Sequence, residues 1–527
     1  MIGHDPWKQD EAYSFGIIYN MYLSGDLVVP TLAGDPFMEK PPAYYITATG
    51  MVHLFSPWLE LHDAARLTSA LYLSIALLFA WLLGRETWGQ AYGPLAAIAL
   101  VSCLGLLHHG HFMITDTSLL AGMTMAYYGL LRSRRARVKG GLLLGTGAGL
   151  AFLSKGLLGP GILGLTALLL PASFRAWRST AFLQALGLAL LAALPWLLIW
   201  PAALYLRSPE LFMTWFWDNN FGRYLGFAQL GPRSKSGFWW KNIPWITFPA
   251  LPLALWTLWR LRRSAFSNPG VQLGLTLSLV IWLVLTASAT ARDLYALPAL
   301  PVLALIGAGA VLELPRPAVT ASYWFSLAVF GLLAAALWVL WVSMLATGQP
   351  PQHEAIARLM PMDFTVTFGP VAFVAATALT LAWLGVVGRF RPPSAGALLS
   401  WPVGLTLVWG IAFTLHLPWL DYAKSYRAVF VAMNQALPPD HGCVADIHLR
   451  ESERGMAHYV AGLITEHIEA PAETECPYIL VETKRRKHPH GVDLGPDWKL
   501  IWTGHRSGDH SELFFLFQRI STEYQAP

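Results

Sequence analysis

Long apolar runs separated by short polar loops dominate the chain from about Leu67 to about Leu415. We count about twelve such runs of roughly 17 to 25 residues, the length that a helix needs to cross about 30 Å of hydrocarbon. Some of the runs are interrupted by Gly or Pro. The pattern predicts an α-helical polytopic membrane protein with about twelve spans.

The composition agrees with this prediction. Of the 527 residues, 55% are hydrophobic and 13% are charged, whereas about a quarter of the residues of a soluble domain carry a charge. The net charge of +5 does not indicate a nucleic-acid partner, because the basic residues lie in short loops between the apolar runs and form no basic module. We expect membrane lipids, and no nucleic acid, around the protein.

The basic loops also predict the orientation of the chain. Counting spans places them all on one face, which the positive-inside rule makes cytoplasmic. Residues 1–65, a loop at roughly 207–242 and the chain after about Pro418 then lie on the opposite, outer face. The basic loops are residues 132–139, 175–178, 260–263 and 389–391.

Three regions follow from the pattern: a first outer loop at 1–65, a helical bundle at 66–417 and a soluble outer domain at 418–527. In the first region, residues 11–23 predict an amphipathic helix with a Tyr-rich side, which we expect to lie flat on the outer membrane surface. Residues 1–65 contain neither a signal peptide nor a span, although the topology requires their translocation. Either a first spanning helix lies upstream of Met1, or the segment crosses as an N-out tail; we favour the first explanation.

The outer region after Pro418 has the pattern of a small α/β domain. Helices are predicted at 426–437 and 455–464, and strands at 443–447, 478–482, 498–504 and 512–518. Cys443 and Cys476 both lie here. In an oxidising compartment they could pair, but the sequence does not give their distance and leaves both states open.

Within the bundle region, Gly141, Gly145 and Gly149 stand four residues apart. The spacing superficially resembles a nucleotide-binding glycine loop, but no strand precedes it. Small residues at this spacing are typical of membrane helices that pack closely, and we adopt that interpretation.

The candidate chemistry lies in ionisable residues that are not at the cytoplasmic ends of spans. A charge at the bilayer centre costs about 2.5 to 3.5 kcal/mol, so such groups should be paired, hydrated or functional. The alternative is that each is an ordinary solvated loop charge, which their clustering on one face disfavours. Carboxylates can act as bases or ligands, and Lys and Arg can hold a phosphate. The residues are Asp10, Glu11, Glu39, Lys40, Asp116, Lys155, Arg223, Arg292, Asp293 and Tyr295.

A histidine run at His108, His109 and His111 could bind a metal. A short run beside a membrane is more often simply interfacial, and we favour that interpretation.

These residues resemble a known family. The motifs QDEAY, YLSGDLVVPTLAGDPFMEKPPAYY, ITDTSLL, FLSKG, NNFGRYLG and RDLYALPALPVLAL, in this order over residues 9–312, are similar to the C-type membrane glycosyltransferases that include the lipid A aminoarabinose transferase and, more distantly, the protein O-mannosyltransferases. The resemblance implies a transmembrane bundle, often with an outer domain, and a first helix ahead of the DE motif. It also implies transfer of a sugar from a polyprenyl phosphate carrier to an acceptor at the outer face.

The resemblance also implies roles for individual residues. Asp10 and Asp116 match the catalytic acidic positions. Glu39 matches a glutamate near a metal or the carrier phosphate, and a divalent metal is therefore the one cofactor that the resemblance brings in. The substrate-binding set implied by the motifs and their surroundings is Glu11, Glu39, Lys40, Lys155, Arg223 and Tyr295.

Two positions depart from the aminoarabinose transferases. Tyr13 stands where they have an arginine, and Asn220 stands where they have a histidine thought to bind metal together with the glutamate. Asparagine is a far poorer zinc ligand than imidazole. The sequence therefore argues against a zinc site at Glu39 and against aminoarabinose as the donor sugar.

Our hypothesis is an inverting hexosyl- or pentosyltransferase of the cell envelope, in the bacterial inner membrane, with its active site on the periplasmic side. Asp10 would act as general base or orient the acceptor, which could be a lipid such as lipid A, a glycan or a protein, and the cations would stabilise the leaving phosphate. The alternative is a transporter or flippase for a lipid-linked sugar. Transporters place their ionisable groups near the midplane, often between two related halves, which this sequence does not show.

Overall fold

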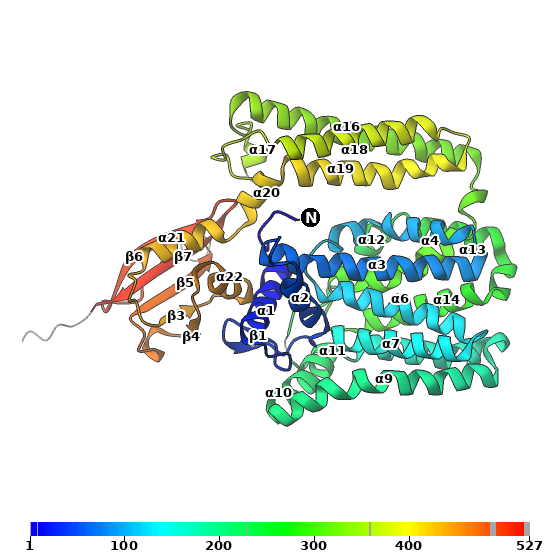
Figure 1. Cartoon of the computed structure of the whole chain (residues 1–527), viewed down its shortest axis with the longest axis horizontal. Coiled ribbons are helices and arrows are strands. Elements are labelled where there is room, and N and C mark those ends of the chain that lie inside the picture. The colour runs from blue at the N-terminus through cyan, green and yellow to red at the C-terminus, as the bar shows by residue number, and fades with distance from the viewer. Residues whose placement is uncertain (1, 8, 229, 358–359, 485–491, 521–527) are drawn as a thin grey trace, which may run out of the picture.

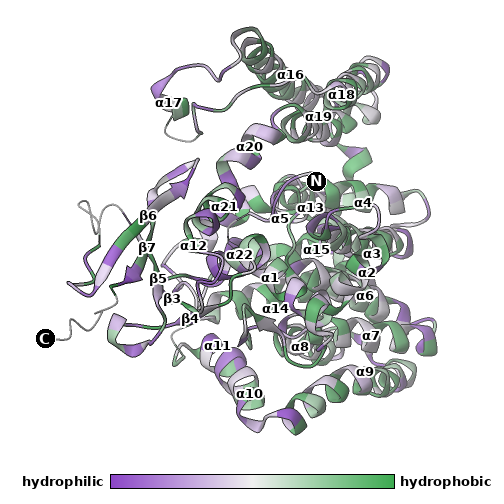
Figure 2. Cartoon of the chain, turned by 60° about the vertical axis from the view of Figure 1, so that its left-hand side comes forward, coloured by the Kyte–Doolittle hydropathy of each residue, from purple (hydrophilic) through white to green (hydrophobic). Residues whose placement is uncertain are grey.

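The computed structural model describes residues 2–7, 9–228, 230–357, 360–484 and 492–520. They form a bundle of helices and a sheet domain beyond one end of it, with α1 (Asp10–Ser24) between the two (Figure 1). The bundle helices are largely hydrophobic along their length, whereas the sheet domain mixes polar and apolar residues (Figure 2). The predicted helical bundle with a C-terminal α/β domain is confirmed.

The main bundle is built from helices of very different length. They are α2 (Ala43–Phe55), α3 (Leu61–Trp88), α4 (Tyr92–Val101), α5 (Leu104–His109), α6 (Thr115–Ser133), α7 (Arg137–Lys155), α8 (Leu158–Ser173), α9 (Thr180–Arg207), α10 (Pro209–Met213), η2 (Thr214–Gly222), α11 (Arg223–Leu225), α12 (Phe238–Ile246), α13 (Ala250–Leu261), α14 (Pro269–Ala287), η4 (Asp293–Ala299) and α15 (Leu300–Ala308).

A second group of helices, α16 (Arg316–Thr347), α18 (Pro370–Arg389) and α19 (Ser400–Leu415), has a hydrophobic core of its own and runs beside the main bundle (Figure 1). The short helix α20 (Leu417–Lys424) then leads into the sheet domain.

Six helices of the described residues are long and apolar enough to span a membrane: α3, α9, α14, α16, α18 and the helix at 395–415. Shorter apolar helices, of 10 to 17 residues, lie at 92–101, 158–173 and 293–308. The sequence predicts about twelve spans, and within the part of the chain that the structure describes only these six meet both criteria. Breaks in the apolar runs account for much of the difference, as at Pro249, where α12 gives way to α13. The protein is a multi-pass membrane protein.

The glycine series of α7 packs this helix against α9. A Cβ at Gly141 would lie 2.7 Å from the Ala185 carbonyl oxygen, and one at Gly145 would lie 2.2 Å from that of Ala189. A side chain would therefore force the two helices apart. The prediction of close helix packing is confirmed.

Two of the four predicted cytoplasmic loops, at residues 132–139 and 175–178, lie next to each other in space. Arg132, in the last turn of α6, and Arg135, just after that helix, pair with Glu86 at the end of α3, at 3.1 and 3.2 Å. Arg134 donates to the carbonyl oxygen of Ala176, in the loop between α8 and α9. These loops therefore lie at a common end of the bundle, as the charge pattern predicts.

The C-terminal domain is a five-stranded sheet in the order β4-β3-β5-β7-β6. Strands β3 (Val444–Ile447), β4 (Thr465–His467) and β5 (Tyr478–Lys484) are parallel, and β6 (Trp498–Arg506) and β7 (Asp509–Arg519) continue the sheet in antiparallel fashion. Helices α21 (Arg427–Ala436) and α22 (Glu451–Ala461) share a core with it. The sequence predicts all of these elements except the three-residue β4. Cys443 and Cys476 form a disulfide, which decides the open question of their pairing.

Helix α1 is not a surface helix. Phe15, Ile17 and Ile18 are fully buried, because α1 packs on α2 and α3 of the bundle on one side and on α22 of the C-terminal domain on the other. Tyr44 and Tyr45 are fully buried as well. The prediction that the helix at residues 11–23 lies flat on the outer membrane surface is therefore wrong, and Tyr44 and Tyr45, in α2, do not anchor the Glu39–Lys40 turn at a lipid interface.

Candidate active site

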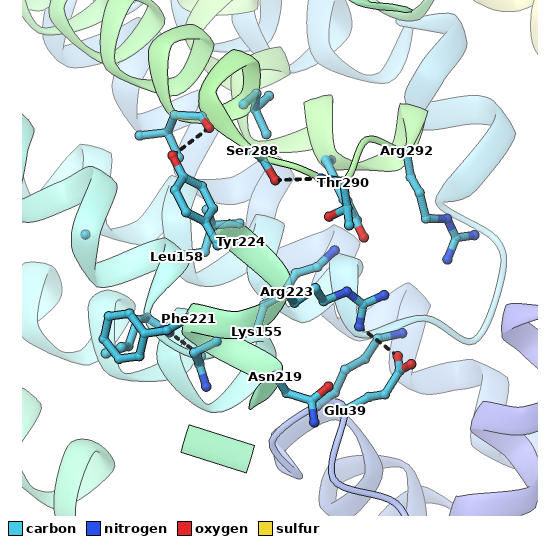
Figure 3. Close-up of a pocket in the computed structure, with 18 of the residues that line it drawn as sticks. Glu39, Lys155, Leu158, Asn219, Phe221, Arg223, Tyr224, Ser288, Thr290 and Arg292 are labelled. Carbon is cyan, nitrogen blue, oxygen red and sulfur yellow. Dashed lines mark hydrogen bonds and ion pairs between the residues drawn. The ribbon is translucent and has the colours of Figure 1, made fainter. Parts of the chain in front are cut away.

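A cavity of about 360 Å³ opens where one end of the bundle meets the segment around Glu39 and Lys40. It gathers six predicted site residues from five separate segments: Glu39, Lys40, Asp116, Lys155, Arg223 and Tyr295 (Figure 3). Much of the remaining lining is apolar, including Leu157, Leu158, Ile162 and Val284. The cavity can therefore hold a charged head group next to an apolar chain.

The Glu39–Lys40 turn lies between a two-residue hairpin, β1 (Thr31–Leu32) with β2 (Asp35–Pro36), and the start of α2. Pro41 and Pro42 keep the pair outside the helix, as predicted, because their fixed φ and missing N–H groups suit an extended entry. Glu39 accepts a hydrogen bond of 3.0 Å from Arg223 (Figure 3). Burial opposes its ionisation, but Arg223 and Lys40 outweigh burial and lower the pKa of Glu39.

Lys155 ends α7, and Gly156 then turns the chain with a φ of +68°. The ammonium group forms an ion pair with Asp116, in the first turn of α6, and lies 4.2 Å from the ring centroid of Tyr295. The predicted residues Asp116, Lys155 and Tyr295 therefore form one contact group. Its ammonium is held at the cavity wall by a carboxylate and an aromatic face.

Asp10 is in the first turn of α1, and its carboxylate forms an ion pair with Arg292. One guanidinium nitrogen of Arg292 donates to Oδ1 at 2.8 Å, and the other forms an ion pair with Oδ2. Tyr13 donates to Oδ1 at 3.0 Å and itself receives a hydrogen bond from Lys40. Burial would raise the pKa of Asp10, but Arg292 and Lys40 outweigh it and hold the pKa well below the usual range.

Arg292 is one of the candidate ionisable residues of the sequence, but no motif there assigns it a role. The arginine that the resemblance expects three residues after Asp10 is replaced by Tyr13. Arg292, from a distant segment, supplies a guanidinium to this carboxylate. Only the fold brings the two residues together, so no local motif could have identified the pair.

Asp10 and Glu11 line a second cavity of about 210 Å³, together with Gln9, His108, His109 and Asp293. Arg292 lines both cavities. The Asp10–Arg292 pair therefore stands between a larger cavity rich in cations and a smaller, polar one.

Glu11 has a different environment from the other predicted site residues. Its side chain is 2% exposed, and it accepts hydrogen bonds from Arg66 at 2.9 Å and from the backbone N–H of Trp7 at 3.1 Å. These contacts anchor the start of α1 to α3. Both carboxylate oxygens are thus bonded within the protein, and the contact of Glu11 with substrate stays a prediction.

The zinc site of the resemblance does not fit this chain. Asn220 is bonded to the backbone on both sides of its amide, since Oδ1 accepts from Leu157 N at 2.9 Å and Nδ2 donates to the Trp215 carbonyl oxygen at 2.8 Å. Glu39 faces Arg223, a cation. A zinc ion would find one already paired carboxylate and no imidazole there.

The overall structure resembles that of a known protein closely. The crystal structure of ArnT from Cupriavidus metallidurans bound to undecaprenyl phosphate superposes with a TM-score of 0.67, at 15% identity, over 98% of this chain and 95% of that one. The chain therefore shares the overall fold of that protein.

Sequence comparisons agree with the C-type fold. Residues 39–200 match the family of dolichyl-phosphate-mannose-protein mannosyltransferases. The undecaprenyl phosphate-α-4-amino-4-deoxy-L-arabinose arabinosyl transferase of Pseudomonas aeruginosa (strain LESB58) is 31% identical over 50% of this chain and 48% of its own. The enzyme of the same name from Pseudomonas savastanoi pv. phaseolicola is 26% identical over 73% of each chain. The chain thus spans about half the length of the first of these relatives, and the resemblance to membrane glycosyltransferases is confirmed.

Proposed function

We propose that the chain is an inverting glycosyltransferase that moves a hexose or pentose from a polyprenyl phosphate carrier to an acceptor at the periplasmic face of the bacterial inner membrane. The observation that carries this proposal is the convergence of Lys40, Lys155, Arg223 and Arg292 on a cavity whose other walls are largely apolar. A lipid-linked phosphate has the matching chemistry, an anion on an apolar chain.

Three of the four cations are paired with carboxylates, and Lys40 donates to the Tyr13 hydroxyl. Asp116 pairs with Lys155, Glu39 with Arg223 and Asp10 with Arg292. A phosphodiester would therefore enter a site that is already close to neutral. It would bind by sharing these cations with their carboxylates, which keeps the cost of desolvating bare charges low.

In the proposed reaction, an acceptor hydroxyl or amine attacks the anomeric carbon from the face opposite the phosphate. The new bond to carbon forms as the bond between that carbon and the phosphate oxygen breaks, and the configuration inverts. The carrier leaves as a phosphate monoester whose growing charge is stabilised by Lys155, Arg223 and Lys40.

Asp10 would hold and receive the acceptor proton. Because its pKa is well below the usual range, its carboxylate is a weak base. Proton transfer would then follow bond formation, when the attacking group has become acidic. The main contribution of Asp10 before that point would be to orient the acceptor.

The names of the matched relatives and of the superposed structure describe transferases and a bound polyprenyl phosphate, and they give no support to the transporter alternative. The test is a mass-spectrometric comparison of carrier-linked sugars and envelope glycoconjugates in cells with the intact chain, with Asp10→Asn, and without the protein. We expect one acceptor to lose a sugar in both defective strains while its carrier-linked donor accumulates. An unchanged acceptor in the Asp10→Asn strain would overturn the role of Asp10.

A further inference from the structure

Two histidines and a carboxylate converge at the edge of the second cavity. His108 and His109 end α5, and Asp293 begins η4. One ligand atom from each residue lies within 4.8 Å of the other two. His109 Nε2 lies 3.2 Å from Asp293 Oδ2, and the other oxygen of Asp293 accepts from the backbone N–H of Leu294 at 2.9 Å. The carboxylate is thereby oriented.

The nitrogen of His109 that faces this cluster is available for a ligand. His109 is 6% exposed, and its buried Nε2 lies 3.2 Å from Asp293 Oδ2 without the geometry of a hydrogen bond to any described residue. A buried polar atom without a hydrogen-bond partner is uncommon in proteins and calls for an explanation. Both histidines and Asp293 also line the 210 Å³ cavity, so a bound group would be reachable from that cavity.

This cluster differs from the other groups of potential metal ligands in the described residues. One of those groups contains Cys443 and Cys476, which are joined in a disulfide. Another consists of three carboxylates in the C-terminal domain, of which Glu512 pairs with Arg506. The group at His108 alone combines imidazole and carboxylate ligands and opens towards Asp10.

We propose that His108, His109 and Asp293 bind a divalent transition-metal ion of the zinc type, with a further coordination position open to the second cavity. Two imidazoles and one carboxylate form a donor set suited to such an ion, and an open position is typical of catalytic sites. Ligand atoms around tetrahedral zinc lie roughly 3.4 Å apart. His109 and Asp293 are already at such a distance, at 3.2 Å, and the His108 ligand atom, within 4.8 Å of both, would need to close by at most about 1.4 Å. This site is separate from the one that the resemblance implies at Glu39, where the paired carboxylate and Asn220 do not fit a zinc ion.

The use of the open position rests on the proposed function. An acceptor oxygen bound there would face Asp10, on the other side of Arg292 from the cationic cavity. The ion would thus bind on the acceptor side and leave the carrier phosphate to Lys155 and Arg223. Binding of the ion itself does not require that the chain be a transferase.

The experiment measures metal binding by the full-length protein, purified in detergent with a tag that contains no histidine. The protein is stripped with a chelator and dialysed against limiting Zn²⁺, and bound metal is counted by elemental mass spectrometry. We expect one tightly held equivalent per chain. His109→Ala and Asp293→Asn should each weaken binding by about 10- to 100-fold or more.

His111→Gln is the matched control. This histidine belongs to the same run, but its Nδ1 contacts the Leu107 carbonyl oxygen at 3.1 Å and its ring packs on Trp409 and Phe413. We expect it to leave the stoichiometry unchanged. Retention of full binding by both His109→Ala and Asp293→Asn, or loss of binding only in the control, would overturn the proposal.

A second measurement needs no variant and so does not depend on whether a mutant folds. Co²⁺ bound to the stripped intact protein should give the strong visible absorption of a four- or five-coordinate site. The weak absorption of a six-coordinate, water-rich ion, or no bound cobalt, would overturn the proposal. Either failure would leave the transfer assay unaffected, so the two hypotheses are tested separately.

Discussion

Arg292 holds Asp10 by both terminal nitrogens of its guanidinium group, across 282 positions of sequence. Tyr13, three residues after Asp10, adds a hydrogen bond to the same carboxylate. The carboxylate is fixed in direction and stays ionised. The contact also divides the two cavities, so the charge and the position of Asp10 depend on one residue from a remote loop.

Replacing Arg292 should change the pH dependence of transfer. Arg292 lowers the pKa of Asp10 against the opposing effect of burial. In Arg292→Gln the pKa of Asp10 should rise towards its ordinary range, because burial is then opposed only by Lys40 and Tyr13. We expect the variant to lose activity at mildly acidic pH, where the intact protein keeps its ionised carboxylate. The measurement is kcat/KM against pH.

The ion pair between Asp10 and Arg292 should also make the stability of the folded protein depend on pH. Since the folded pKa of Asp10 is lowered, its ionised form contributes stability above the unfolded pKa, and this contribution is lost as the pH falls through the folded value. For the pH profile of kcat/KM, Arg292→Lys is the control. It keeps a positive charge and should shift that profile less than Arg292→Gln does. An identical profile in Arg292→Gln and in the intact protein would contradict the assignment.

Removing the ammonium group of Lys155 should weaken the use of the carrier-linked donor. A hydrogen bond to a charged group contributes about 1.5 to 3 kcal/mol, which corresponds to about a ten- to hundredfold change. We expect kcat/KM for the donor to fall by this factor in Lys155→Met, measured with purified protein. Lys241→Met, at an exposed position outside the cavity lining, should show no change. Equal loss in both variants would point to a general effect of charge.

Helix α1 and helix α22 approach each other at two glycines. A Cβ at Gly16 would lie 2.9 Å from the Cα atom of Gly455. Gly16→Ala should therefore push the C-terminal domain away and lower both the melting temperature and the activity. Gly50→Ala is a matched change in helix α2, where a Cβ meets no atom within 4 Å, and it should be neutral or stabilising by up to about 1 kcal/mol.

The disulfide between Cys443 and Cys476 closes a loop with a sequence separation of 33. A loop of this length corresponds to about 3 to 4 kcal/mol in the chain-entropy description of disulfides. We expect the double replacement by Ser to lower the resistance of the C-terminal domain to proteolysis in the intact protein. Unchanged cleavage kinetics would show that the pair contributes little to stability.

The sequence predicted the parts of the protein that depend on local pattern. The strands at β5 and β7 have compact apolar runs, and the ionisable residues at Glu39, Asp116 and Lys155 stand out because charge is costly near lipid. The pairing of Asp10 with Arg292 could not be predicted, since it depends on how distant loops meet.

The error on α1 has a physical cause. A Tyr-rich amphipathic helix is suited both to a membrane surface and to a protein interface, because each offers an apolar side and polar partners. The sequence of residues 11–23 does not reveal that α22 covers the other side. The histidine run was ambiguous for a similar reason, since Asp293 reaches it only through the fold.

The segment just ahead of α1 is tied to residues near the other end of the chain. Asp5 pairs with Arg427 and accepts from Ser425 at 2.6 Å, and the Trp7 indole donates to Asp421 at 2.8 Å. During synthesis these partners emerge more than 400 residues after Asp5. The helix that carries Asp10 therefore gains these restraints only after residue 427 has been translated. A polypeptide that ends before this point would contain Asp10 and Arg292 but lack the contacts that hold the segment ahead of α1 in place.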